Sequence, residues 1–271
     1  MKPRDAGARI AAGLLVALLS TAAPAVELQL RAMDEVSLRE SAGNGQLLQL
    51  HVAGGAAAVD LLLEPDQDLL PGGRLGNTQA LQGHIAGKKG SWARITRRMG
   101  RYQGIFSDGQ DVYVLERAGA LARLHAPARA LDPETRVLYR LADLTVRGAF
   151  FEGDAATVVR SAADTFGIVG AEIALGTTPL LPTKRLDLGL LADTELVAAD
   201  GSGLDASVAD RVAVADGIFA SQAGVRIRLG SLTRVDTNAD GLASLDPNTL
   251  LDQVAVYRKT HAAQQGFGDT H

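Results

Sequence analysis

The stretch IFSDGQDVYV, residues 105–114, indicates how the first half of this chain folds. Two short apolar runs flank Asp108-Gly109, a pair that tolerates the positive φ of a tight hairpin turn. Apolar residues also alternate with polar ones in VELQLR, residues 26–31, and in LQLHV, residues 48–52, as in strands with one buried face. We therefore expect a β-rich, antiparallel domain over residues 26–150.

The N-terminal 25 residues have the three parts of a bacterial signal peptide. Basic residues come first, and an apolar run over residues 10–19 follows that is too short to span a bilayer. Ala23-Pro24-Ala25 then gives the A-x-A pattern that signal peptidase accepts. We expect cleavage before Val26 and a secreted or periplasmic location, with an uncleaved membrane anchor as the alternative.

Composition removes several classes of function. The 271-residue chain contains no cysteine, which excludes disulfides, thiolate metal sites and thiol catalysis. Its 27 basic and 31 acidic residues give a net charge of -4, so no long-range field attracts nucleic acid or an anionic membrane. We expect neither nucleic acid nor, after signal cleavage, a membrane as partner.

The second half of the chain has a different pattern. Residues 151–184, with GTTPLLP at 176–182, are typical of a connector between domains. An apolar strand over 186–192, a helix over about 206–222 that Gly224 can end, and an alternating strand over 225–229 then predict a βαβ unit with parallel strands. Asp246-Pro247 is typical of the start of a further helix. The expected fold class is therefore α+β or α/β, with a βαβα unit over residues 185–271.

Parts of both halves resemble the reprolysin-type (adamalysin/ADAM-like) metzincin zinc metallopeptidases in their bacterial secreted form. The segments that carry the resemblance are residues 81–87, 91–95, 104–106, 186–196, 212–229, 250–257 and 267–270. The first three are similar to the core of the family's propeptide, and the others to the opening of its peptidase domain. The resemblance implies the N-terminal portion of a secreted zinc-dependent metalloendopeptidase precursor, which would act on a protein or peptide substrate once a downstream catalytic segment completes it.

The catalytic motif of that family is absent from this chain. Its zinc site needs H-E-x-x-H on a helix and a third histidine after a glycine turn. The five histidines of this chain lie far apart, and none has a histidine partner at that spacing. We therefore expect a chain truncated before the zinc-binding helix, with no catalytic residues and no bound zinc. The alternative is a non-catalytic secreted or periplasmic binding module that recognises a protein or envelope component.

Calcium is a second candidate metal, because several oxygen-bearing side chains have the spacing of a calcium loop. Asp236, Asn238 and Asp240 match the D-x-N-x-D-G start of a calcium loop, although the twelfth position is Pro247 rather than a carboxylate. A polar loop before a helix explains the same residues. The resemblance adds Asp187, which matches a strand carboxylate that helps to hold calcium in several family members, and an outward polar residue is again the alternative.

Lys184-Arg185 forms a candidate processing site between the two halves. The pair is basic, and it follows Pro182 at the end of the expected connector, where exposed chain favours proteolysis. Charges that flank a strand explain it equally well.

Overall fold

The computed structural model describes residues 27–43, 45–53, 58–123, 131–147, 182–235, 242 and 247–265. The expected signal peptide, with Ala23 and Ala25 at its cleavage site, lies outside these residues. Most of the expected connector also lies outside them, and so do Asp236, Asn238 and Asp240.

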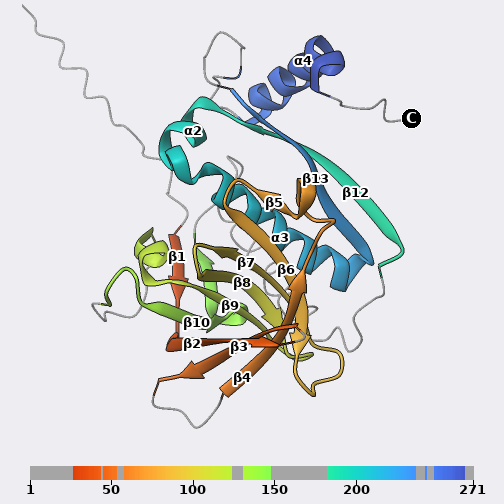
Figure 1. Ribbon diagram of the computed structural model, residues 1–271. Coiled ribbons are helices and arrows are strands. Elements are labelled where there is room, and N and C mark those ends of the chain that lie inside the picture. Colours follow the sequence, from red (N-terminus) through yellow and green to blue (C-terminus); the bar gives the residue numbers. More distant parts are fainter. Residues whose placement is uncertain are drawn as a thin grey trace, which may run out of the picture.

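Eight antiparallel strands form a closed barrel, shown in Figure 1. In chain order they are β2 (Asp34–Gly43), β3 (Gly45–Val52), β4 (Ala58–Pro65), β6 (Thr78–Ile85), β7 (Trp92–Arg98), β8 (Arg101–Ser107), β9 (Val112–Arg117) and β10 (Arg136–Arg140). Their spatial order is β4-β3-β2-β10-β9-β8-β7-β6, and β4 pairs with β6 to close the ring. Closure leaves these strands no free sheet edge along that seam.

Short elements surround the barrel. Strand β5 (Arg74–Leu75) pairs antiparallel with the beginning of β6, and β1 (Glu27–Leu30) pairs with β11 (Leu144–Arg147) in a separate antiparallel ribbon. Short stretches of 3-10 helix are η1 (Pro71–Gly73), η2 (Ala118–Arg123), η3 (Leu141–Asp143) and η4 (Gly201–Gly203).

Alternating inward residues fill the barrel. The largest cluster of buried apolar side chains includes Leu48, Leu50, Leu61, Leu81, Ile95, Phe106 and Leu115, all 1% exposed or less. A glycine permits the closure of the ring, because a Cβ on Gly83 would lie 1.9 Å from the carbonyl oxygen of Leu62 on β4. The period of two seen in the sequence therefore reflects an interior face and an exterior face.

The hairpin expected at residues 105–114 is present. Ser107 of β8 pairs with Val112 of β9, and four residues connect them rather than two. Asp108 Oδ1 accepts hydrogen bonds from the backbone N–H groups of Gln110 (2.9 Å) and Asp111 (2.8 Å), while Gly109 has a φ of 89°.

The second half of the chain consists of β12 (Lys184–Ala192), α2 (Thr194–Asp200), α3 (Leu204–Ala223), β13 (Val225–Arg234) and α4 (Pro247–Gln265). Strands β12 and β13 pair in parallel. Helix α3 ends at Gly224, which has a φ of 64° and donates its N–H to the carbonyl of Phe219. Within the described residues, no helix combines the length and the apolar character that crossing a bilayer requires.

The fold class expected from the sequence is wrong. Its described residues are mostly antiparallel β, and they do not form a metzincin-like α/β unit. The β12–β13 pair remains two strands wide, and α3 lies between this pair and the barrel, where it contacts β6, β7 and β8 (Figure 1). One apolar cluster accordingly combines Leu69, Leu70 and Ala80 with Val208, Val212, Ile227 and Leu229. Helix α3 therefore uses the outside of the barrel as the surface that buries its apolar side.

Buried charges reinforce this junction. Asp216 of α3 is fully buried and accepts hydrogen bonds from Arg94 Nε on β7 (2.6 Å) and from the backbone N–H of Ile227 on β13 (2.7 Å). Arg226 of β13 donates to Asp216 (2.9 Å) and to Asp66, the residue after β4 (2.6 Å). Two carboxylates thus face two guanidinium groups, which is how a protein interior accommodates ionised groups.

Candidate functional site

A polar pocket lies between the outside of the barrel and the N-terminal half of α3, and we call it the α3 pocket. Its volume is about 560 Å³. Strands β7, β8 and β9 contribute Thr96, Arg98, Gln103 and Arg117, while α3 contributes Ser207 and Asp210. Strand alternation places Thr96 and Arg98 on the exterior face of the barrel, which α3 covers.

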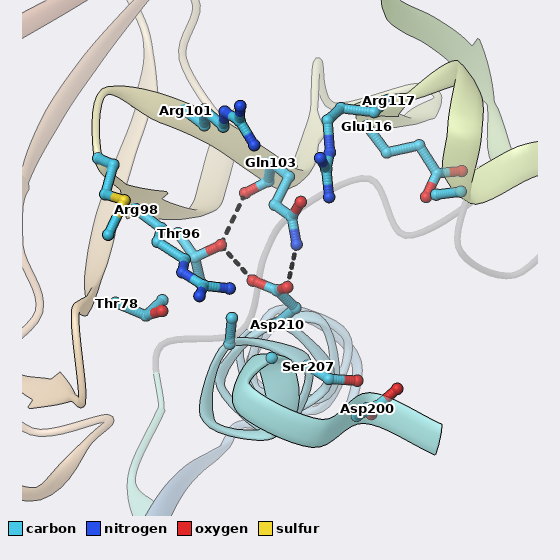
Figure 2. Close-up of a pocket in the computed structure, with 14 residues that line it drawn as sticks. Thr78, Thr96, Arg98, Arg101, Gln103, Glu116, Arg117, Asp200, Ser207 and Asp210 are labelled. Carbon is cyan, nitrogen blue, oxygen red and sulfur yellow. Dashed lines mark hydrogen bonds between the residues drawn. The ribbon is translucent and has the colours of Figure 1, made fainter. Parts of the chain in front are cut away.

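Asp210 lies at the centre of the α3 pocket, as Figure 2 shows. Its two carboxylate oxygens accept hydrogen bonds from the hydroxyl of Thr96 and from the side-chain amide of Gln103. Burial raises the pKa of Asp210 to about 6, and these two hydrogen bonds, with the charges of Arg98 and Arg117, oppose that rise. The carboxylate is therefore held by two hydrogen bonds, and its pKa lies above that of an ordinary aspartate.

Three arginines, Arg98, Arg101 and Arg117, line the pocket together with its carboxylates. Arg98 lies beside Asp210, and Arg117 points into the space above α3 (Figure 2). Arg101 Nη2 lies 3.2 Å from Glu134 Oε2, and Arg117 Nη1 lies 3.0 Å from Glu134 Oε1. One exposed carboxylate thus bridges two guanidinium groups, whose planar forks suit carboxylates and phosphates.

Two further carboxylates line the pocket. Asp200, at the end of α2, has a buried Oδ2 to which no described residue donates a hydrogen bond. Glu116 points away from Asp210 (Figure 2) and accepts a hydrogen bond of 2.7 Å from the hydroxyl of Tyr139. Burial raises the pKa of Glu116 as well. A buried acceptor without a donor is uncommon, so this oxygen marks Asp200 as a candidate ligand contact.

The residues singled out from the sequence lie elsewhere. Lys184 and Arg185 are exposed at the beginning of β12, where their backbones pair with Val225 and Arg226. Their role in processing stays a prediction.

Asp187, also exposed on β12, is paired with two arginines and not with other carboxylates. Arg185 Nε lies 3.1 Å from its Oδ1, and Arg228 Nη2 donates to its Oδ2 at 3.1 Å. Asp236, Asn238 and Asp240 lie outside the described residues. Among the residues that the structure describes, no group of three or more histidines and carboxylates is placed to hold a metal ion. Calcium binding stays a prediction.

Sequence reasoning missed every residue of the α3 pocket. The sequence contains one weak indication of this site: Asp210 and Asp216 interrupt the apolar pattern of residues 206–222. Carboxylates at such positions are rare unless they are paired. Their partners, Thr96, Gln103 and Arg94, lie more than 100 residues earlier in the chain, where local patterns give no information about the contact.

Comparison with known proteins finds no protein-family model and no curated protein that matches this chain. The argument for function therefore depends on the geometry of the α3 pocket.

Proposed function

We propose that this chain is a non-catalytic binding module that takes a polar group of a protein or envelope component into the α3 pocket. The observation that carries this proposal is the pocket of about 560 Å³ that Asp210, Asp200 with its unpaired oxygen, and three arginines line together. Pockets of 300 to 1,000 Å³ with a few convergent polar groups are typical ligand sites.

The chemistry of Asp210 favours binding over catalysis. Both of its oxygens accept hydrogen bonds from side chains of the barrel, so the group is held as an acceptor. The other carboxylate with a raised pKa, Glu116, is bonded to Tyr139 and directed away from the cavity. A paired acid and base facing one reacting atom would be the signature of catalysis, and the described residues of the pocket do not form one.

The hypothesis of a peptidase precursor stays a prediction, and one of the arguments for it is lost. It relied in part on a metzincin-like α/β unit, which the structure replaces with a helix and two strands packed on a barrel. An H-E-x-x-H-x-x-G-x-x-H segment encoded downstream would support it. The secreted or periplasmic location expected from residues 1–25 is likewise a prediction, and it suits a module that binds envelope components.

A thermal-shift screen of small polar compounds tests the binding proposal. Ser207→Trp places an indole in the pocket, whereas Gln222→Trp places one on the exposed side of the same helix as a matched control. We expect compounds that raise the melting temperature of the wild type and of Gln222→Trp but not of Ser207→Trp. Binding that Ser207→Trp leaves intact, or no binding by any compound, would contradict the proposal.

A further inference from the structure

The Glu134 carboxylate is paired with two of the arginines that line the α3 pocket. It lies 3.2 Å from Arg101 and 3.0 Å from Arg117, so each of its oxygens faces a different guanidinium. Glu134 belongs to the turn before β10, where its backbone N–H donates to Asp132. The side chains of Glu134 and Arg101 are both 57% exposed. A carboxylate therefore already lies between Arg101 and Arg117, and it belongs to an exposed side chain that can move into solvent.

We propose that the ligand of the α3 pocket carries an oxyanion group, a carboxylate or a phosphate, which replaces the Glu134 carboxylate between Arg101 and Arg117. This inference rests on the proposed function and adds the chemical class of the ligand. Glu134 then acts as an internal competitor that holds the two arginines in place when the ligand is absent.

Replacing the Glu134 carboxylate with a ligand oxyanion costs little free energy. Exposed ion pairs contribute little to stability, so losing the contacts of Glu134 lowers the apparent affinity by no more than about fivefold. An incoming oxyanion regains charge-assisted hydrogen bonds to the same two guanidinium groups. Arg98 adds a third positive charge from the end of β7.

Carboxylates in the lining select for a different kind of group. Asp210 and Asp200 both line the pocket, and Asp200 Oδ2 accepts no hydrogen bond from a described residue. A hydroxyl or amide donor suits these carboxylates and a second negative charge does not. The ligand class is therefore an anionic group that also carries neutral hydrogen-bond donors.

Isothermal titration calorimetry with two matched pairs of probes tests this inference. Gluconate and gluconamide differ in one carboxylate, while glycerol 3-phosphate and glycerol differ in one phosphate. At pH 7 and constant ionic strength we expect the anionic member of at least one pair to bind, and its neutral partner to bind at least about tenfold more weakly. The pair that responds distinguishes a carboxylate ligand from a phosphate ligand.

Variants of the full chain then assign the contact. Glu134→Gln removes the competitor and should tighten binding by about threefold to fivefold. Arg117→Gln should weaken it by about tenfold or more, and Arg101→Gln, a change at an exposed side chain, gives the same direction if Arg117→Gln is poorly folded. Arg140→Gln is the matched control, because Arg140 pairs with Asp143 outside the pocket and its loss should leave affinity unchanged.

Equal binding of charged and neutral probes would overturn the inference, and so would an unchanged or weaker affinity in Glu134→Gln. The same measurements distinguish failure of this inference from failure of the proposed binding function. If a neutral compound binds and Ser207→Trp blocks it while neither anion binds, the binding function holds and the oxyanion inference fails. If Ser207→Trp blocks no ligand, both fail.

Discussion

Asp210 shows how one buried carboxylate couples the stability of this fold to pH. The pKa of Asp210 is about 6 in the folded protein because burial disfavours its charged form, compared with 3.8 for the ordinary group. Ionising it therefore costs more in the folded state than in the unfolded state. Its contribution to stability is most favourable below about pH 4, falls as the pH rises toward 6 and is constant above that.

Asp210→Asn removes this titration while keeping nearly the same shape. Relative to the wild type, we expect the free energy of unfolding of the variant to rise by about 2 to 3 kcal/mol between pH 4 and pH 7, from a shift of about two pH units. Urea denaturation of both proteins across that pH range measures the difference. A difference that does not change with pH would show that Asp210 titrates normally and is not buried as described.

Helix α3 is the element that connects the barrel to the rest of the chain. Its limits could be predicted from the sequence within two residues, because the apolar period and Gly224 are local signals. Its packing partner could not be predicted, since the contact between Asp216 and Arg94 spans 122 residues of sequence. Parallel strands with a crossover helix suggested an α/β sheet, but here the barrel wall takes the place of further strands.

Removing the buried charge of α3 tests this junction. Asp216→Ala leaves Arg94 and Arg226 without their shared acceptor, and we expect a loss of about 3 to 5 kcal/mol in the free energy of unfolding. Asp205, also on α3, makes a partly exposed ion pair of 2.6 Å with Arg234 of β13. Asp205→Ala breaks this pair and should lower the free energy of unfolding by no more than about 1 kcal/mol. Chemical denaturation gives both values, and similar losses in the two variants would argue against a buried network.

Gly217 reports how closely α3 approaches the barrel. A Cβ at this position would lie 2.6 Å from Trp92 and 3.0 Å from Arg94, both on β7. Replacing a helical glycine with alanine usually stabilises by about 1 kcal/mol, but here we expect Gly217→Ala to destabilise by about 1 to 3 kcal/mol through overpacking. Thermal unfolding checks the sign, with exposed Arg211→Ala as the control. A stabilised Gly217→Ala would mean that α3 does not pack against β7 at this distance.

At the scale of the whole molecule, the two halves share one apolar cluster and one charge network. The strand patterns and the hairpin at residues 105–114 predicted a β-rich first half, since alternation is a local property. Closure of the ring between β4 and β6 could not be predicted, because it depends on register between distant strands. The pocket follows from the same long-range packing of α3 on that ring.

A shared core predicts cooperative unfolding. Trp92, the single tryptophan, lies on β7 against α3, so its fluorescence reports the junction, while far-UV circular dichroism reports the whole fold. We expect the two signals to change together in urea, with one midpoint. Two separated transitions would favour the division into independently folding domains at residues 26–150 and 185–271.

The central claim is that the α3 pocket is a ligand site, and amide NMR mapping of a compound that binds tests it most directly. Titration into labelled protein should shift the backbone signals of Thr96 and Gln103 on the barrel together with those of Ser207 and Asp210 on α3. These residues come from two strands and a helix that together line the pocket, so their joint response locates the ligand between them. Shifts confined to α4 or to the free edge of β12, with the pocket signals unchanged, would contradict the account.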